Sequence, residues 1–135
     1  MAVHKLYNAS VVINGVDLSD HVKSVTINTG VNALDDTAMG DSTKSNLGGL
    51  LTWDITVDFE QDYASGKVDA TLSPLVGSTT TIVCKPDAGS VSSTNPSWTG
   101  TGLLTSYKPL GGSVGDLHLT QGKFDSASTL VRATS

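Results

Sequence analysis

One alternating segment near the middle of this 135-residue chain constrains its fold more than any other feature. Between residues 51 and 60 every second residue is apolar, and the residues in between are Thr, Asp or Glu. Successive side chains of a β-strand point to opposite faces of a sheet, so a period of two buries one face and wets the other. A helix would scatter the same apolar residues around its circumference. The segment is therefore predicted to be a strand whose wet face carries Thr52, Asp54, Thr56, Asp58 and Glu60.

The composition agrees with a mainly β fold. Charged residues make up 16% of the chain, against an ordinary share of about 25%. Threonine and valine, which suit a pleated surface, are frequent, and 14 glycines supply turns and bulges. Asn14-Gly15 predicts a tight hairpin. Further strands are predicted at residues 22–31, 79–85, 98–107, 116–124 and 129–134, all within one domain spanning residues 1–135.

Residues 62–76 break the alternation. Apolar residues recur there at spacings near three and four, which favours a helix packed against the sheet. Asp62 is a candidate N-cap, and Gly77 follows the expected end. Pro74 is expected to end the helix early. The sequence therefore predicts one short helix.

Residues 32–49 have a different character, with three aspartates, several glycines and a run of Ser, Thr and Asn. Loops longer than about 12–15 residues are uncommon in compact domains and are usually functional or disordered. Leu34 and Met39 give the segment little to bury. A long arm or extended hairpin is predicted, and it is expected to be mobile in an isolated subunit.

Residue patterns for catalysis or metal binding are weak. Ser19, Asp20 and His21 are adjacent, but neighbours on an extended segment point to opposite faces, so they do not predict a relay. The three histidines lack metal-ligand spacing, and the acidic residues of segment 32–49 do not match a calcium loop. The single cysteine, Cys84, lies in a predicted strand and is expected to be a buried thiol. We expect no enzyme activity, no metal and no cofactor.

Charge narrows the possible partners. The net charge is −5, and Arg132 is the only arginine, so ordinary binding to a phosphate backbone is not expected. No run of about 20 apolar residues is present, and the first ten residues contain no apolar core of a secretory signal. The chain is therefore expected to begin in a cytoplasm.

The order of these features resembles the tail tube, or major tail, protein family of siphophages. The resemblance begins with Val11-Val12-Ile13-Asn14-Gly15-Val16-Asp17-Leu18-Ser19-Asp20-His21-Val22 and continues through the strand at 23–28, the polar arm and the alternating strand. It ends with the helical region, the strand at 79–85 and the stretch at 98–108. The resemblance covers nearly the whole chain as an order of elements.

What this resemblance implies is a small β-sandwich or barrel with one flanking helix and a long extended loop. Proteins of this family form hexameric rings that stack into a hollow tube on a tape measure protein, between a tail terminator and distal tail proteins. Strands of neighbouring subunits join into a barrel around a lumen, through which the genome passes at infection. The chain would then be a virion protein, assembled in the host cytoplasm.

The resemblance also suggests roles for residues. The wet face, Thr52 to Glu60, is the expected lumen lining, because an acidic wall does not hold a polyanion; it could instead be the outer surface of the tube. The arm is expected to contact the neighbouring ring through Leu34, Asp35, Asp36, Met39 and Leu47.

Three alternatives remain open. A tail terminator or a decoration protein would share this composition. A ligand-binding β-sandwich could use Trp98 and Tyr107 to stack a sugar or base. An enzyme could use His21.

Overall fold

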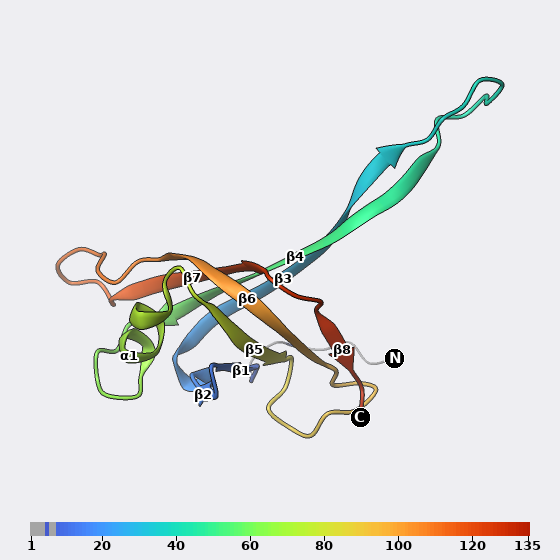
Figure 1. Cartoon of the computed structure of the whole chain (residues 1–135). Helices are drawn as coiled ribbons and strands as arrows, with labels where there is room; N and C mark the ends of the chain where they lie inside the picture. Colours follow the sequence, from blue (N-terminus) through green and yellow to red (C-terminus); the bar gives the residue numbers. More distant parts are fainter. Residues whose placement is uncertain (1–4, 6–7) are drawn as a thin grey trace.

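The computed structural model describes Lys5 and residues 8–135, and the strands of this part form one curled antiparallel sheet (Figure 1). The strand order is β2-β1-β5-β6-β7-β4-β3, and β8 pairs with β6. The strands are β1 (Ser10–Ile13), β2 (Val16–Asp17), β3 (Val22–Asp35), β4 (Asn46–Glu60), β5 (Thr79–Lys85), β6 (Ser97–Tyr107), β7 (Leu119–Ser126) and β8 (Val131–Ala133). The helical elements are η1 (Ser19–His21), α1 (Val68–Leu72) and η2 (Ser73–Leu75). The mainly β fold with a short flanking helix is confirmed.

The alternating segment forms the C-terminal part of β4, as predicted. Trp53, Ile55, Val57 and Phe59 are buried, and the residues between them face outward. Leu51 is the exception, with 76% of its surface exposed. β7 pairs with β4 only from Asp54 onward, so Leu51 lies beyond the covered part of the strand.

β6 changes partners along its length. Its first half pairs with β5 and β8, and its second half pairs with β7. Gly100 lies between the part of β6 that pairs with β8 and the part that pairs with β7. A Cβ at this position would approach the Trp53 ring to 2.9 Å. A larger residue at position 100 would therefore collide with the indole.

The β1–β2 hairpin forms at the predicted Asn14-Gly15 turn, with Ile13 paired to Val16. Asn14 and Gly15 both have positive φ, at 52° and 78°. Asn and Gly tolerate this conformation better than other residues do, which explains their use here.

Segment 32–49 forms the distal part of a hairpin made by β3 and β4, which projects from the body as an arm (Figure 1). The last paired residues are Asp35 and Asn46. At the tip, Asp35 Oδ1 accepts a hydrogen bond from the Thr37 amide at 2.9 Å, and Asp41 Oδ2 accepts one from the Ala38 amide at 2.8 Å. Two of the three acidic residues in the arm therefore shape its turn.

The predicted helix begins later than expected. α1 starts at Val68, and Asp62 is not its N-cap; Asp62 Oδ1 instead accepts the Ala64 amide hydrogen bond at 2.9 Å in a preceding turn. Gly66, with φ of 74°, lies in the left-handed region, which interrupts any earlier helix. Gly77 follows the helical segment at a φ of 80°, as expected. The strands predicted at 116–124 and 129–134 are shifted or shortened to β7 and β8.

Candidate assembly surfaces

A polar face extends over three neighbouring strands on the side of the sheet away from the core. Asp58 accepts hydrogen bonds from Ser24 on β3 at 2.8 Å and from Gln121 on β7 at 3.0 Å. Asp54 accepts one from Asn28 at 3.2 Å. Thr52, Asp54, Thr56, Asp58 and Glu60 therefore share one water-facing surface, as their alternation predicts.

The polar face carries more negative than positive charge. Lys23 pairs with Glu60 at 3.8 Å, and Lys123 pairs with Asp125 at 4.0 Å. Asp54 lies directly opposite Asp125 across the strands, a like-charge pair that sheets usually avoid. Asp54 and Asp58 have no lysine partner in the described part of the chain. The face thus presents unneutralised carboxylates to the surrounding water.

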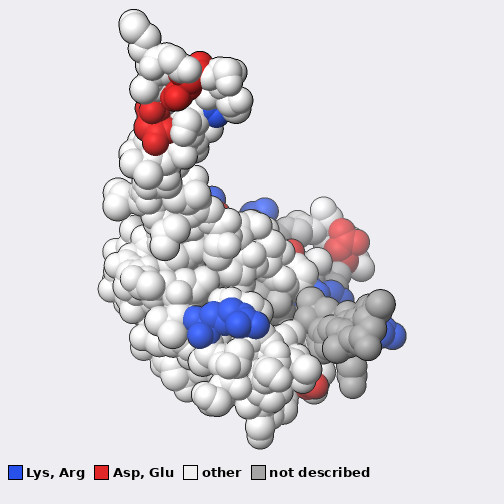
Figure 2. Space-filling view, turned by 90° about the vertical axis from the view of Figure 1, so that its right-hand side faces the viewer, with Lys and Arg blue, Asp and Glu red and all other residues white. Residues whose placement is uncertain are grey.

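The arm exposes apolar side chains, which we call the arm patch. It consists of Val31, Leu34, Met39, Leu47, Leu50 and Leu51. Isolated exposed apolar residues are normal, whereas large exposed apolar patches are typical of protein–protein interfaces. Figure 2 shows acidic side chains gathered near the end of the same projection.

An open hollow of about 800 Å³, which we call the arm-root groove, lies where the arm meets the body. One wall is formed by the arm residues Leu50 and Leu51, and the other by residues 126–130. Trp98 and Arg132 also line it. Sequence analysis did not predict this groove, because its walls come from four distant segments.

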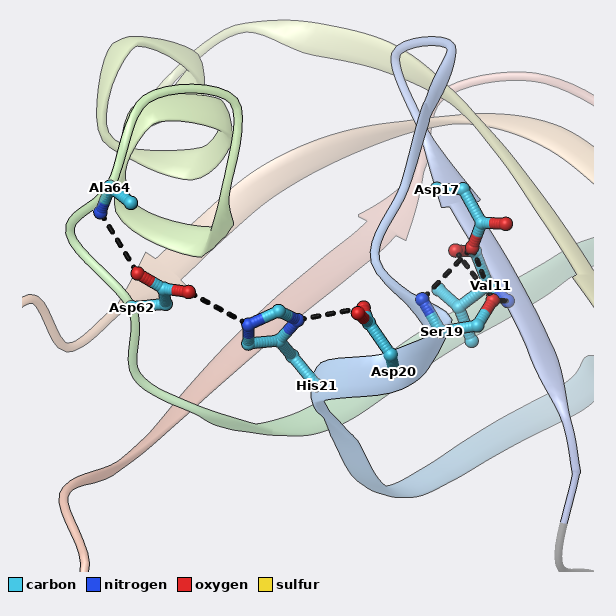
Figure 3. Close-up of polar contacts among 7 residues, drawn as sticks. All are labelled: Val11, Asp17, Ser19, Asp20, His21, Asp62 and Ala64. Carbon is cyan, nitrogen blue, oxygen red and sulfur yellow. Dashed lines mark hydrogen bonds and ion pairs between the residues drawn. The ribbon is translucent and has the colours of Figure 1, made fainter.

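His21 is held between two carboxylates (Figure 3). Its Nδ1 lies 2.8 Å from Asp20 Oδ1, and its Nε2 lies 2.9 Å from Asp62 Oδ2. An ionised carboxylate only accepts hydrogen bonds, so both contacts are satisfied when both ring nitrogens carry protons. The hydrogen bond with Asp20 is the main cause that raises the pKa of His21. The arrangement, which we call the His21 clamp, joins η1 to the segment before α1.

The clamp covers His21, because only 16% of its side chain is exposed. It also bears on the Ser-Asp-His alternative. Ser19 Oγ hydrogen-bonds Asp17 and Val11 rather than His21 (Figure 3). Ser19 therefore has no histidine base within reach, in agreement with the sequence-based reasoning against a relay.

The remaining candidates do not assemble into a reactive site. Cys84 is buried, as predicted, and burial raises the pKa of its thiol to about 12. Across Lys5 and residues 8–135, no group of three or more acidic, His or Cys side chains could hold a metal ion. No helix in the same residues is long and apolar enough to cross a membrane.

Trp98 and Tyr107 do not form one ligand site. They lie nine positions apart on β6, so about 30 Å of extended strand separates them. The Tyr107 hydroxyl donates to Asp69 at 2.7 Å and accepts from Gln61 at 3.0 Å. Tyr107 thus anchors α1 to the sheet, while Trp98 lines the arm-root groove.

This chain, a curled antiparallel sheet with a short flanking helix and a long hairpin arm, has the fold of solved phage tail tube structures. In particular, it is similar to a protein of the native gene transfer agent virion, with 16% identity and a TM-score of 0.72, covering 91% of this chain and 95% of the other. A chain in the tail of the empty gene transfer agent particle, solved with C6 symmetry, matches at 17% identity and a TM-score of 0.67 over 85% and 83% of the two chains. The SPP1 tail tube protein matches at 7% identity and a TM-score of 0.72 over 95% and 77%. No family profile and no curated sequence matches the chain.

Proposed function

We propose that this chain polymerises as stacked hexameric rings into the hollow tail tube of a phage or phage-like particle, which serves as a conduit for DNA. The observation that carries this proposal is the arm. Among the described residues, the distal part of β4 pairs with β3 alone, and the arm patch is left in water. An element of this kind gains its missing contacts when copies of the chain assemble.

The open edge of β3 supports the same conclusion. In the described part of the chain this 14-residue strand pairs only with β4, along one of its two edges. A long unpaired edge is a template for further strand pairing, and proteins usually block it. A neighbouring subunit in a ring would pair with this edge and extend the sheet into a continuous barrel.

The polar face suits the inside of such a barrel. Its unneutralised carboxylates, Asp54 and Asp58 among them, repel phosphate groups, so DNA passes without being held. Thr52, Thr56 and Glu60 complete the proposed lumen lining. The opposite face of β4 is occupied by the core and is not open to a channel.

The arm is assigned to the contact between rings. Leu34, Met39 and Leu47 are exposed along it and supply apolar area for an adjacent ring. Asp35 shapes the turn at the tip, and Asp36 lies beside it. In this assignment the arm residues matter for assembly rather than for the stability of one subunit.

The solved structures support this role. Two of the similar chains belong to gene transfer agent particles, one of them a tail with C6 symmetry, and a third forms the SPP1 tail tube. By the family resemblance, the proposed partners are copies of the chain, a tape measure protein, a tail terminator and distal tail proteins. The protein would reside in the virion tail after assembly in the host cytoplasm.

Negative-stain electron microscopy of the purified full chain tests the proposal. We expect hollow tubes of stacked rings when the protein concentration is raised, with and without added tape measure protein. Isolated rings that never stack would instead indicate a tail terminator, and capsid binding without rings would indicate a decoration protein. A monomer at every concentration and with every partner would refute polymerisation.

A further inference from the structure

We propose that the arm-root groove of one copy holds the loop of residues 108–118 from a second copy in the adjacent ring. This inference rests on the proposed function and specifies one contact between rings. It is separate from the assignment of the arm itself, because the groove lies at the root of the arm and is lined largely by the body.

The loop, which connects β6 to β7, carries exposed apolar side chains on an anchored base. Leu110 and Leu117 are 78% and 59% exposed, and Val114 at the tip is fully exposed. At the base, the Tyr63 hydroxyl donates to the Pro109 carbonyl at 2.6 Å, and the Gly111 amide donates to His118 Nε2 at 3.2 Å. A loop with a fixed base and an apolar tip is preorganised for insertion, because less conformational entropy is lost on binding.

The groove offers a matching apolar lining. Leu50 and Leu51 form one wall and are 84% and 76% exposed. Trp98 and Leu130 contribute further apolar surface. Both walls are attached to the sheet. Leu50 and Leu51 belong to β4, and the indole of Trp53 in the same strand donates to the Ser128 carbonyl at 2.7 Å.

The two surfaces lie at opposite ends of the molecule. β4 runs from the arm to Glu60, which pairs with Leu119 directly after the loop. Figure 1 shows the β6–β7 connection at one end of the sheet and the arm projecting from the other. A contact between two different surfaces of identical copies is heterologous, and placing them at opposite ends makes the contact repeat along an axis. The geometry therefore suits stacked rings better than a closed dimer.

Charge complementarity supports the loop as the occupant. Arg132 lines the groove and makes no ion pair within the described residues, and Asp116 in the loop makes none there either. Both side chains are exposed. Bringing them together would pair the chain's only arginine with a free carboxylate of the second copy. Charge complementarity of this kind fixes which surfaces meet and in what register.

A pair of cysteines tests the contact in assembled tubes. The double variant Leu50→Cys with Val114→Cys is assembled and then oxidised with copper phenanthroline in air, which takes electrons from two thiols as a disulfide forms. Because a disulfide requires Cα atoms within about 7 Å, bonds form only if loop and groove meet. We expect a ladder of covalent oligomers on a non-reducing gel. Each single variant is the matched control and should give no ladder, since Cys84 is buried.

A charge swap provides an independent test. Arg132→Asp should raise the protein concentration needed for tubes about tenfold, a change of about 1.4 kcal/mol. Adding Asp116→Arg to the same chain should restore it. If tubes of the double cysteine variant give no ladder, or if Arg132→Asp leaves assembly unchanged, the groove contact is refuted while the tube function stands. If the wild-type chain forms no tubes, the proposed function itself fails.

Discussion

The indole nitrogen of Trp53 donates a hydrogen bond to the carbonyl oxygen of Ser128, which lies 2.7 Å away and 75 positions later in the chain. Trp53 is the first buried residue of β4 after the arm, and Ser128 lies on the segment that leads to β8. The bond therefore fixes the root of the arm to the C-terminal part of the sheet. The ring of Trp53 also packs against Gly100, so one side chain links three distant segments.

The close contact between Trp53 and Gly100 predicts a stability defect. In Gly100→Ala, the new Cβ would meet the indole at 2.9 Å and Leu130 at 3.1 Å, and both neighbours are packed. Overpacking of this kind costs about 1–3 kcal/mol, so the urea midpoint should fall. Gly89→Ala is the matched control, because a Cβ at Gly89 would meet no described atom within 4 Å. Equal midpoints for the two variants would contradict the packing argument.

The His21 clamp predicts pH-dependent stability. The folded pKa of His21 is raised above its ordinary value of 6.5, so its contribution is present below that pH and is lost as pH rises through the folded pKa. The pKa values of Asp20 and Asp62 are lowered from 3.8, by hydrogen bonds from His21 and from the Ala64 amide respectively, so their contribution is lost as pH falls through the folded values. Lys67 also bears on both carboxylates.

The change that tests the clamp is His21→Gln. The Tm difference between wild type and variant should be largest near about pH 5 and should shrink above pH 7 and below pH 4. His118→Gln is the control, since His118 has no carboxylate partner in the described residues and should leave this profile in place. A pH-independent difference for His21→Gln would show that the histidine acts by packing alone.

The arm patch predicts that assembly and folding can be separated. In Leu34→Ser with Leu47→Ser, both side chains are half exposed, so the free energy of unfolding should change by no more than about 1 kcal/mol. Tube formation should be lost, as judged by sedimentation and microscopy. Val76→Ser, at an equally exposed apolar position beside η2, should still form tubes. Normal tubes from the double arm variant would remove these leucines from the interface.

The polar face predicts an effect on DNA passage. Replacing Asp54, Asp58 and Glu60 with lysine should leave tubes intact, because all three side chains reach water. The reversed wall should bind phosphates and slow DNA ejection, increasingly so at low salt. The neutral variants Asp54→Asn, Asp58→Asn and Glu60→Gln control for the loss of hydrogen bonds. Virions with the lysine wall that eject DNA at the normal rate would show that this face does not line the lumen.

Local patterns predicted the strands well where burial alone decides them. The alternation at residues 51–60 and the Asn14-Gly15 turn depend on nearest neighbours, and both appear in the structure. The start of the helix was harder to predict. Asp62 is a typical N-cap residue, but the left-handed conformation of Gly66 delays the start of α1 to Val68. Glycine adopts positive and negative φ with similar ease, so its presence at position 66 permits the left-handed conformation without fixing where the helix begins.

The sites that depend on long-range contacts could not be predicted. His21 and Asp62 are 41 positions apart, and the antiparallel pairing of β3 with β4, which sets Val22 opposite Phe59, brings them together. The arm-root groove combines residues near Gly30, Leu50, Trp98 and Ser128 for the same reason. The roles given to the polar face and the arm remain proposals, since they concern contacts between copies of the chain.

The unbroken course of β4 from the core into the arm has a mechanical consequence. Asn46 lies seven positions before Trp53, so the distal strand is a lever of about 23 Å with its pivot in the core. A tilt of about 10° at the pivot would displace the far end by about 4 Å, which exceeds the tolerance of a packed contact. Substitutions around Trp53 can therefore leave a subunit folded but tilt its arm. The defect would then appear only when copies of the chain assemble.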